Sequence, residues 1–239
     1  IRPEFLHYAP PGVVCLENTH NRCGGAVIGA DDVASVAEVA RRHGLPLHLD
    51  GARLFNASVA TGQPLTAWTE HVTSVQVCLS KGLAAPVGSL VAGSHGYIRK
   101  VRRARKLLGG GMRQAGVLAA AGLVAFDEMI DRLAEDHANA TILAEGLGRL
   151  PGILLDPARV QTNIVVFGLN GGLDADAFVR AVDRAGVRLV DLGGGRLRAV
   201  THYGISADDC RKAVAACAQA MDGLLKPEAW PSTSSGHPE

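Results

Sequence analysis

Residues 47–53, Leu47-His48-Leu49-Asp50-Gly51-Ala52-Arg53, decide how this chain folds. The stretch begins as a short apolar strand, turns at Gly51 and continues as a helix, and the carboxylate of Asp50 stands where the strand ends. Open α/β sheets bind ligands in the crevice outside the carboxyl ends of their strands, so an acid at this point is a candidate binding residue. Asp before Gly is also a common turn or helix-capping residue, and Asp50 alone fits either role.

A lysine follows the next apolar strand in the same way. Residues 74–79 predict a buried strand, and Ser80-Lys81-Gly82 comes directly after it. Lys81 alone would be interpreted as a lysine that reaches solvent. Together with Asp50 it fits pyridoxal phosphate, because the amine can form a Schiff base with the cofactor aldehyde and the carboxylate can keep the pyridine nitrogen protonated. We interpret Gly51 and Gly82 as positions that let a planar cofactor approach the backbone closely.

Strands and helices alternate through the first half of the chain. Strands separated by helices of ordinary length indicate crossover connections and a mostly parallel sheet. Apolar runs predict strands at 13–16, 46–50, 74–79 and 89–92, and helical periodicity predicts helices at 31–42, 52–60 and 97–108.

The second half begins with a long helical pattern rich in Ala and Leu, which runs from Arg113 to the break at Leu150-Pro151-Gly152. We expect two α/β domains: residues 1–133 belong to a large domain that ends in the long helix, and residues 134–226 form a smaller one. Residues 227–239, rich in Pro and Ser, are expected to be a disordered tail. Beyond the break, strands are predicted at 153–155, 163–167, 188–190 and 197–200, and helices at 174–185 and 206–224.

Composition and charge exclude several function classes. With 239 residues, 47% of them hydrophobic, the chain can bury a sizeable core, which excludes an intrinsically disordered protein. The 24 lysines and arginines and 23 acidic residues give a net charge of +1, so no overall field exists to hold nucleic acid or an anionic membrane. No apolar run is long enough to cross a membrane. The five cysteines lack a C-x-x-C pair and are interpreted as reduced thiols in a reducing compartment.

Four motifs, in order, resemble the low-specificity L-threonine aldolases, which belong to the aromatic amino acid β-eliminating lyase/threonine aldolase group of fold-type I pyridoxal-phosphate enzymes. The similarity extends from about Gly12 to Asp222. It implies an α/β fold of the pyridoxal-phosphate-dependent transferase (aspartate aminotransferase) type. The motifs are HLDGAR (48–53), VCLSKGL (77–83), RKLLGGGMRQAG (105–116) and LRAVTH (197–202), with LENTHN (16–21) and Thr162-Asn163 as further family-like stretches.

The resemblance assigns roles to four residues. Lys81 matches the lysine that forms the Schiff base with pyridoxal phosphate, and Asp50 matches the partner of the pyridine nitrogen. Arg53 matches a side chain that binds the ring hydroxyl oxygen and helps to hold the substrate carboxylate. Arg198 matches the main carboxylate arginine, for which the bidentate guanidinium–carboxylate pair is the physical reason. Without the motif, Arg198 would be interpreted as an exposed strand arginine in an ion pair.

Lys106 and Arg113 flank the triple glycine at 109–111. In the family they project from one subunit toward the cofactor phosphate and active-site mouth of its neighbour, so the resemblance implies a homodimer or homotetramer with active sites at the dimer interface. Taken alone, the basic residues at 99–106 would indicate a solvated helix face or a nucleic-acid patch. The balanced overall charge and the lack of interleaved aromatic residues argue against nucleic acid.

The histidines leave alternatives open. His48 shares a strand face with Asp50, and His202 follows Arg198 by four positions. Each of the two has either a direct chemical role or a structural hydrogen bond. The remaining histidines have no acidic or cysteine cluster spaced for a metal, so we expect no metal chemistry. A serine hydrolase is not indicated, because the chain lacks a G-x-S-x-G elbow.

The resemblance predicts the reaction: cleavage of L-threonine or L-allo-threonine, β-hydroxy-α-amino acids, to glycine and an aldehyde, in cytosolic threonine catabolism and glycine biosynthesis. The resemblance also implies a preceding segment with a phosphate cradle, a ring-stacking histidine and a serine near the substrate carboxylate. Whether that segment includes a mitochondrial targeting signal is left open. Two alternatives remain. The same framework serves other chemistry at Cα, such as β-elimination or racemisation, and a truncated relative could be catalytically dead and act only as a dimerising protein.

Overall fold

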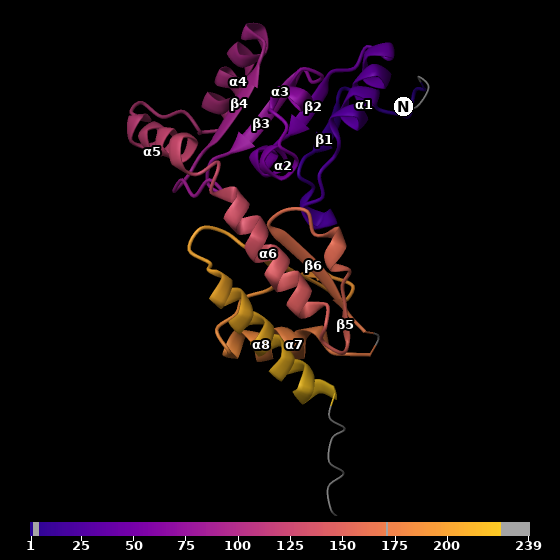
Figure 1. Cartoon of the computed structure of the whole chain (residues 1–239). Coiled ribbons are helices and arrows are strands. Elements are labelled where there is room, and N and C mark those ends of the chain that lie inside the picture. Colours follow the sequence, from indigo (N-terminus) through magenta and orange to yellow (C-terminus); the bar gives the residue numbers. More distant parts are fainter. Residues whose placement is uncertain (2–4, 171, 226–239) are drawn as a thin grey trace, which may run out of the picture.

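The computed structural model describes residues 1, 5–170 and 172–225 and contains two four-stranded sheets, one in each half of the chain (Figure 1). The first sheet has the order β1-β2-β3-β4. Its strands β1, β2 and β3 are parallel, and β4 is antiparallel to β3, so the mostly parallel sheet predicted from the alternating pattern is confirmed. The strand bounds are Val14–Glu17 for β1, Leu47–Asp50 for β2, Ser74–Cys78 for β3 and Ser89–Gly93 for β4.

The crossover helices α1 (Ala30–Arg42) and α2 (Leu54–Thr61) and the short helix α3 (Thr66–Thr69) connect these strands. The core of this half is a cluster that includes Val33, Leu47, Leu49, Leu54 and Trp68, all buried. Because Leu47 and Leu49 alternate with His48 and Asp50 along β2, burial of the leucines fixes which face of the strand each polar residue takes.

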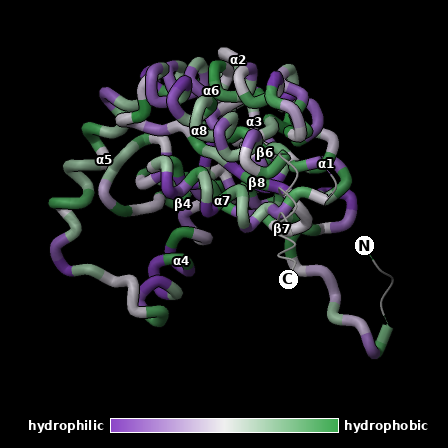
Figure 2. Tube along the Cα trace, turned by 90° about the horizontal axis from the view of Figure 1, so that it is seen from below, coloured by the Kyte–Doolittle hydropathy of each residue, from purple (hydrophilic) through white to green (hydrophobic). Residues whose placement is uncertain are grey.

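Helices α4 (His95–Leu107) and α5 (Gly116–Glu128) project from the side of the first half where β4 lies, with α4 in contact with β4 (Figures 1 and 2). The prediction of one continuous helix from Arg113 to Leu150 is wrong, since the chain breaks after α5 and resumes as α6 (Leu133–Leu147). No glycine or proline causes the break. Met129 and Ile130 instead turn into the hydrophobic cluster of Leu79 and Leu83, and this tertiary packing overrides the local helical preference.

The second sheet has the order β5-β6-β8-β7 and is antiparallel throughout. Phe167, Phe178, Leu197 and Met221 are among the buried residues of its core. The strand predicted at 188–190 starts two residues later. The elements are β5 (Ile153–Leu154), β6 (Ile164–Leu169), β7 (Val190–Gly193), β8 (Arg196–Val200), α7 (Ala175–Arg184), α8 (Ala207–Leu225) and the 3-10 turns η1 (Asn21–Cys23) and η2 (Pro157–Arg159).

Helix α6 contacts both halves. Leu133, its first residue, is buried in the cluster of Leu79 and Leu83, whereas Ala140, Leu143 and later residues join the core of the second sheet. The domain boundary at residue 133 stays a prediction, and the predicted tail at 227–239 lies outside the described residues. Within the described ranges, we find no helix with the length and apolar character that a bilayer crossing requires.

The loop that follows β1 joins the two halves through hydrogen bonds to the second sheet. The backbone N–H of Val27 donates to Gln161 Oε1 at 2.8 Å, and Thr162 Oγ1 donates to the backbone oxygen of Gly25 at 2.8 Å. The second contact is buried. Residues far apart in sequence are therefore held together next to the carboxyl ends of β1 and β2.

Candidate active site

Asp50 lies at the carboxyl end of β2, as the strand-end motif predicts. Its Oδ1 accepts a hydrogen bond from the backbone N–H of Ala52 at 3.0 Å, and its backbone oxygen accepts one from Asn18 at 2.9 Å. Glu17 is its register partner on β1. The bond from Ala52 orients the carboxylate at the sheet edge, and Oδ2, which no described residue bonds, is left for a ligand.

Lys81 lies in a tight turn just after β3. The backbone oxygen of Lys81 accepts from the N–H of Ala84 at 2.9 Å, and the N–H of Ala85 donates to Leu79 at 3.0 Å. Ala84 has φ of +56°, a left-handed conformation that non-glycine residues rarely adopt. The turn thus stores backbone strain next to the candidate nucleophile, which is common at functional sites.

A cleft of about 420 Å³ brings Lys81 and Arg53 together. Residues of both halves line it, so its shape depends on how the two sheets are placed relative to each other. Its polar lining comprises Arg53, Ser80 and Lys81 from the first half and Asn163, His202 and Tyr203 from the second.

Arg53, the residue before α2, is surrounded by other charged candidates. Burial lowers the pKa of the Arg53 guanidinium most, the positive charge of Arg198 lowers it further, and Glu17, Cys78 and Asp50 act in the opposite direction. Two of the four residues to which the resemblance assigns roles, Asp50 and Arg198, are therefore within electrostatic reach of a third, Arg53. Two arginines held this close favour an anionic ligand between them.

Arg198 lies on β8 and reaches back to the loop after β1. Its Nη1 donates to Asn21 Oδ1 at 2.7 Å, and the backbone N–H of Asn21 donates to Glu17 Oε1 at 2.9 Å. Arg198 Nε is buried and has no hydrogen-bond partner among the described residues. A buried unpaired donor is costly, and a carboxylate that accepts from the guanidinium would satisfy it.

The structure does not bring Lys106 and Arg113 to this cleft. Lys106 is near the end of α4 and Arg113 is in the loop before α5, and both side chains are exposed. Within one copy of the chain, neither residue lines the cleft around Lys81.

The two histidines with open roles differ. His48 Nδ1 is 2.8 Å from Ser74 Oγ on the neighbouring strand, which matches the structural alternative. His202 lines the cleft, with Nδ1 2.8 Å from the backbone oxygen of Tyr203.

The interpretation of the two glycines as room for a cofactor is wrong. A Cβ at Gly51 would be 2.9 Å from the backbone oxygen of Gln76, and one at Gly82 would be 2.7 Å from Leu133 Cδ2. The protein itself occupies the space at both positions, by backbone at Gly51 and by the end of a leucine side chain at Gly82. Sequence reasoning could not detect this, because the neighbours belong to other elements.

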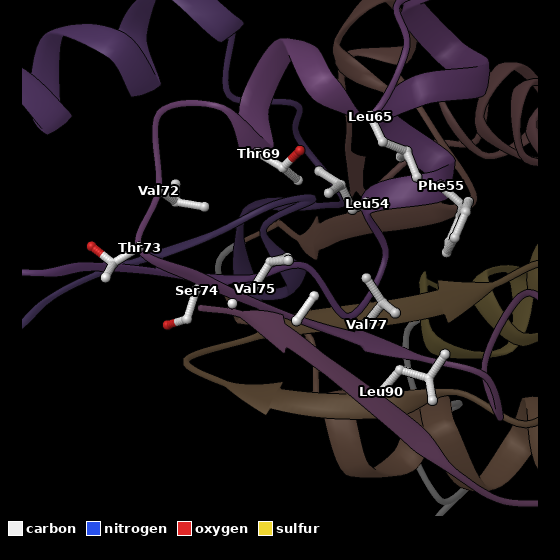
Figure 3. Close-up of a pocket in the computed structure, with 12 residues that line it drawn as sticks. Leu54, Phe55, Leu65, Thr69, Val72, Thr73, Ser74, Val75, Val77 and Leu90 are labelled. Atoms are coloured by element: carbon white, nitrogen blue, oxygen red, sulfur yellow. The ribbon is translucent and has the colours of Figure 1, made fainter. Parts of the chain in front are cut away.

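A second pocket, of about 350 Å³, lies between α2, α3 and the strands β3 and β4 (Figure 3). Its lining is mostly aliphatic, and among the described residues it contains no ionisable side chain. Leu54, Val75, Val77 and Leu90 contribute to it, and the polar groups present are hydroxyls such as Thr69. It offers no ionisable group for acid–base chemistry. The candidate active site is the cleft that holds Lys81 and Arg53, two of the residues to which the resemblance assigns roles.

Sequence reasoning assigned no role to Asn21, Asn163 or Tyr203. Asn21 and Asn163 lie in the stretches 16–21 and 162–163, which the resemblance singled out without giving them a function. That signal pointed to the right segments, and the structure adds that Asn21 holds Arg198 while Asn163 and Tyr203 line the cleft.

Comparisons with known proteins identify the family and the fold of this chain. The family model for beta-eliminating lyases matches residues 1–169. Low-specificity L-threonine aldolase 1 of Arabidopsis thaliana is 43% identical over 222 residues, which cover 92% of this chain and 62% of that protein. The chain therefore spans about six-tenths of the length of that relative.

Solved structures show the same fold. The threonine aldolase of Leishmania major superposes with a TM-score of 0.70 at 19% identity, over 90% of this chain and 63% of that one. A PLP-dependent aminotransferase from Streptococcus suis superposes with a TM-score of 0.69 at 18% identity, over 90% of this chain and 59% of that one. The predicted transferase-type α/β fold is confirmed. Since the family model covers most of the sequence, this chain belongs to the beta-eliminating lyase family.

Proposed function

We propose that this sequence carries the lysine and carboxylate-binding part of a pyridoxal-phosphate-dependent aldolase, which cleaves L-threonine or L-allo-threonine to glycine and an aldehyde. One observation carries the proposal: Lys81 and Arg53 share a cleft, and Asp50 and Arg198 act on Arg53 from the two sheets. The name and 43% identity of the Arabidopsis relative support the choice of reaction.

The residues present fit the cofactor. Lys81 is exposed in the cleft, where its amine can bind the cofactor aldehyde. Asp50 offers a fixed carboxylate that can accept a hydrogen bond from the protonated ring nitrogen. When bound, pyridoxal phosphate supplies an electron-withdrawing ring that stabilises negative charge at the substrate Cα. Asp50 supports this by keeping positive charge on the ring, since an ionised carboxylate favours the protonated nitrogen.

Arg198 and Arg53 would bind and orient the substrate carboxylate. Arg198 Nε is a buried donor without a partner among the described residues, and Asn21 fixes the other side of the guanidinium through Nη1. Because the Arg198 guanidinium is already held at Nη1, it loses little conformational freedom when the carboxylate binds. The orientation of the guanidinium is therefore established before the substrate arrives. The positive charges of both arginines also favour the substrate carboxylate over the aldehyde product, which has no charged group.

We propose that the assembled protein is a homodimer or homotetramer in which Lys106 and Arg113 contact the cofactor phosphate of a neighbouring subunit. Exposed apolar side chains lie close to them in the sequence: Leu108 is 87% and Val117 is 83% exposed. Exposed apolar patches of this kind mark interaction sites. Threonine catabolism and glycine biosynthesis in the cytosol are part of the same proposal.

Covalent trapping tests the role of Lys81. The purified chain is incubated with pyridoxal phosphate, reduced with borohydride and mapped by peptide mass spectrometry. We expect the label on Lys81 in preference to the other lysines, no label at this peptide in Lys81→Ala, and unchanged labelling in the matched surface variant Lys212→Ala. Labelling spread evenly over the surface lysines would contradict the proposal.

Product analysis tests the reaction. With L-threonine or L-allo-threonine we expect glycine and acetaldehyde in equal amounts, lost in Lys81→Ala. Pyruvate from serine would instead indicate β-elimination, and D-amino acid would indicate racemisation. Selective label on Lys81 without any turnover would support the dead relative.

A further inference from the structure

Asn56 is a buried amide next to the lysine turn. It lies in the first turn of α2 and is 2% exposed. Its Nδ2 is 3.1 Å from Nε2 of His137 on α6 and 3.4 Å from Oδ1 of Asn163 at the start of β6. A side chain from the first half is thus bonded to two side chains that belong to later elements.

The same amide lies beside Gly82, the residue that follows Lys81. A Cβ built on Gly82 would be 3.5 Å from Asn56 Oδ1 and 3.9 Å from Asn56 Nδ2. Since Gly82 follows Lys81 directly, the buried amide packs beside the lysine turn. A rotated or shifted amide would alter the position of that turn.

The other end of the network reaches the arginine strand. Asn163 Nδ2 donates to the backbone oxygen of Thr201 at 2.9 Å, and the N–H of Thr201 donates to Asn163 at 3.0 Å. Thr201 Oγ1 donates to the backbone oxygen of Asp136 at 2.6 Å. Thr201 comes directly after β8, the strand of Arg198. The amides of Asn56 and Asn163 therefore connect the lysine turn to the strand of the carboxylate arginine.

Counting donors fixes the protonation of the network. The NH₂ group of Asn56 has two hydrogens, and both are used, one toward His137 Nε2 and one toward Asn163 Oδ1. His137 Nε2 must then be an acceptor, with its proton on Nδ1. Burial lowers the pKa of His137, against the opposing effect of Asp136, so the ring is neutral as this arrangement requires.

We infer that Asn56 is a positioning residue for Lys81, held by His137 and Asn163 so that the lysine turn stays aligned with the strand of Arg198. This inference rests on the proposed function, because Lys81 has to bind the cofactor. It assigns Asn56 no contact with substrate or cofactor. Asn56 acts through the backbone of Gly82, and misplacement of a reacting group by about 1 Å can cost on the order of a hundredfold in rate.

The variant Asn56→Asp separates positioning from simple space filling, because it keeps the shape and removes both donors. A carboxylate facing two acceptors is repulsive unless His137 takes up a proton and donates. Among the described residues Asp136 is the charged group that acts on His137, and it is paired with Arg132 at 2.6 Å. We therefore expect the pKa of His137 to rise above its ordinary value in Asn56→Asp.

Two measurements on the full chain test the inference. The first is an NMR titration of the His137 ring, assigned with His137→Gln, in the wild type and in Asn56→Asp. The second is the rate of borohydride trapping of pyridoxal phosphate on Lys81, divided by the rate on exposed Lys212 in the same molecule. Because unfolding would also lower this ratio, the variants are compared at equal folded fraction, checked by circular dichroism, and Ser58→Ala, on the same helix, is the matched control.

We expect Asn56→Asp and Asn56→Ala to lower the trapping ratio about tenfold or more and His137→Gln to keep it within about twofold, because the Gln oxygen still accepts from Asn56. His137→Leu should behave like Asn56→Ala. An unchanged ratio in both Asn56 variants would overturn the inference. If wild-type Lys81 shows no preferential trapping, the proposed function fails, and an unshifted His137 pKa in Asn56→Asp overturns the network by itself.

Discussion

Replacing Gly82 with Ala tests whether this glycine serves packing or a ligand. Its φ is not in the left-handed region, so Ala brings no backbone strain. The new Cβ, however, would be 2.7 Å from Leu133 Cδ2, and Leu133 is fully buried and cannot swing into solvent. Overpacking of this kind costs about 1–3 kcal/mol. The lower entropy of the unfolded chain with Ala returns about 0.4–1 kcal/mol.

The two ranges combine to a destabilisation of about 0–2.6 kcal/mol, about 1.3 kcal/mol at their midpoints, which corresponds to a fall in Tm of about 3–5 °C for a chain of this size. Denaturant titration and calorimetry measure both quantities. Gly116→Ala is the matched control, because a Cβ there meets nothing within 4 Å and a helix position favours Ala. Its stability should stay equal or rise.

A double variant identifies the clashing atom. Leu133→Val removes the δ carbons, so combining it with Gly82→Ala should recover about 1–2 kcal/mol relative to the sum of the single changes. Full stability in Gly82→Ala together with weakened binding of pyridoxal phosphate would refute the packing argument. Gly82 would then be needed for the approach of the cofactor. Additive single effects would show that Leu133 is not the obstacle.

Three further predictions concern charges and thiols. Arg132→Ala should lower the unfolding free energy by about 3–5 kcal/mol, because it leaves the fully buried carboxylate of Asp136 without its partner. Loss of an exposed ion pair should cost less than about 1 kcal/mol. An equally small loss for Arg132→Ala and for an exposed pair would contradict the prediction. Burial raises the pKa of the Cys217 thiol to about 12, and hydrogen bonding at Ser80 is the main cause that lowers the pKa of Cys78, so thiol reagents should label Cys78 much faster than Cys217 in the folded chain. Because the unfolded Cys217 thiol ionises first, stability should fall as the pH rises above about 8.5, and less so in Cys217→Ala. His137 has a lowered pKa in the folded state, so its contribution is present above its ordinary pKa and is lost as the pH falls; His137→Gln should flatten the acid side of the stability profile.

Much of the fold was predictable because its signals are local. The strand that ends at Asp50 and the one that precedes Lys81 are short apolar runs, each followed within a few residues by a glycine, and both are found where the pattern places them. The break between α5 and α6 was not predictable. It depends on Met129 and Ile130 packing on residues far away in sequence, and the local composition favours a continuous helix.

The site shows the same division. Asp50, Lys81 and Arg53 belong to motifs with clear local positions, so their candidacy could be read from the sequence. The support of Arg198 by Asn21 could not, because a contact between residues of different sheets leaves no periodic pattern. The roles of the individual residues in cofactor and substrate binding stay predictions that the trapping and product experiments decide.

The hydrogen bond between Arg198 and Asn21 joins residues separated by 177 positions, and this has a consequence for how the chain is made. A ribosome adds about 5–20 residues per second, so Asn21 leaves the tunnel roughly 9–35 s before Arg198 does. The parallel strands of the first sheet can form during that time, but the cleft cannot. Its assembly is therefore a late step of biosynthesis, and slower translation of the second half would lengthen the period in which the nascent first sheet depends on chaperones.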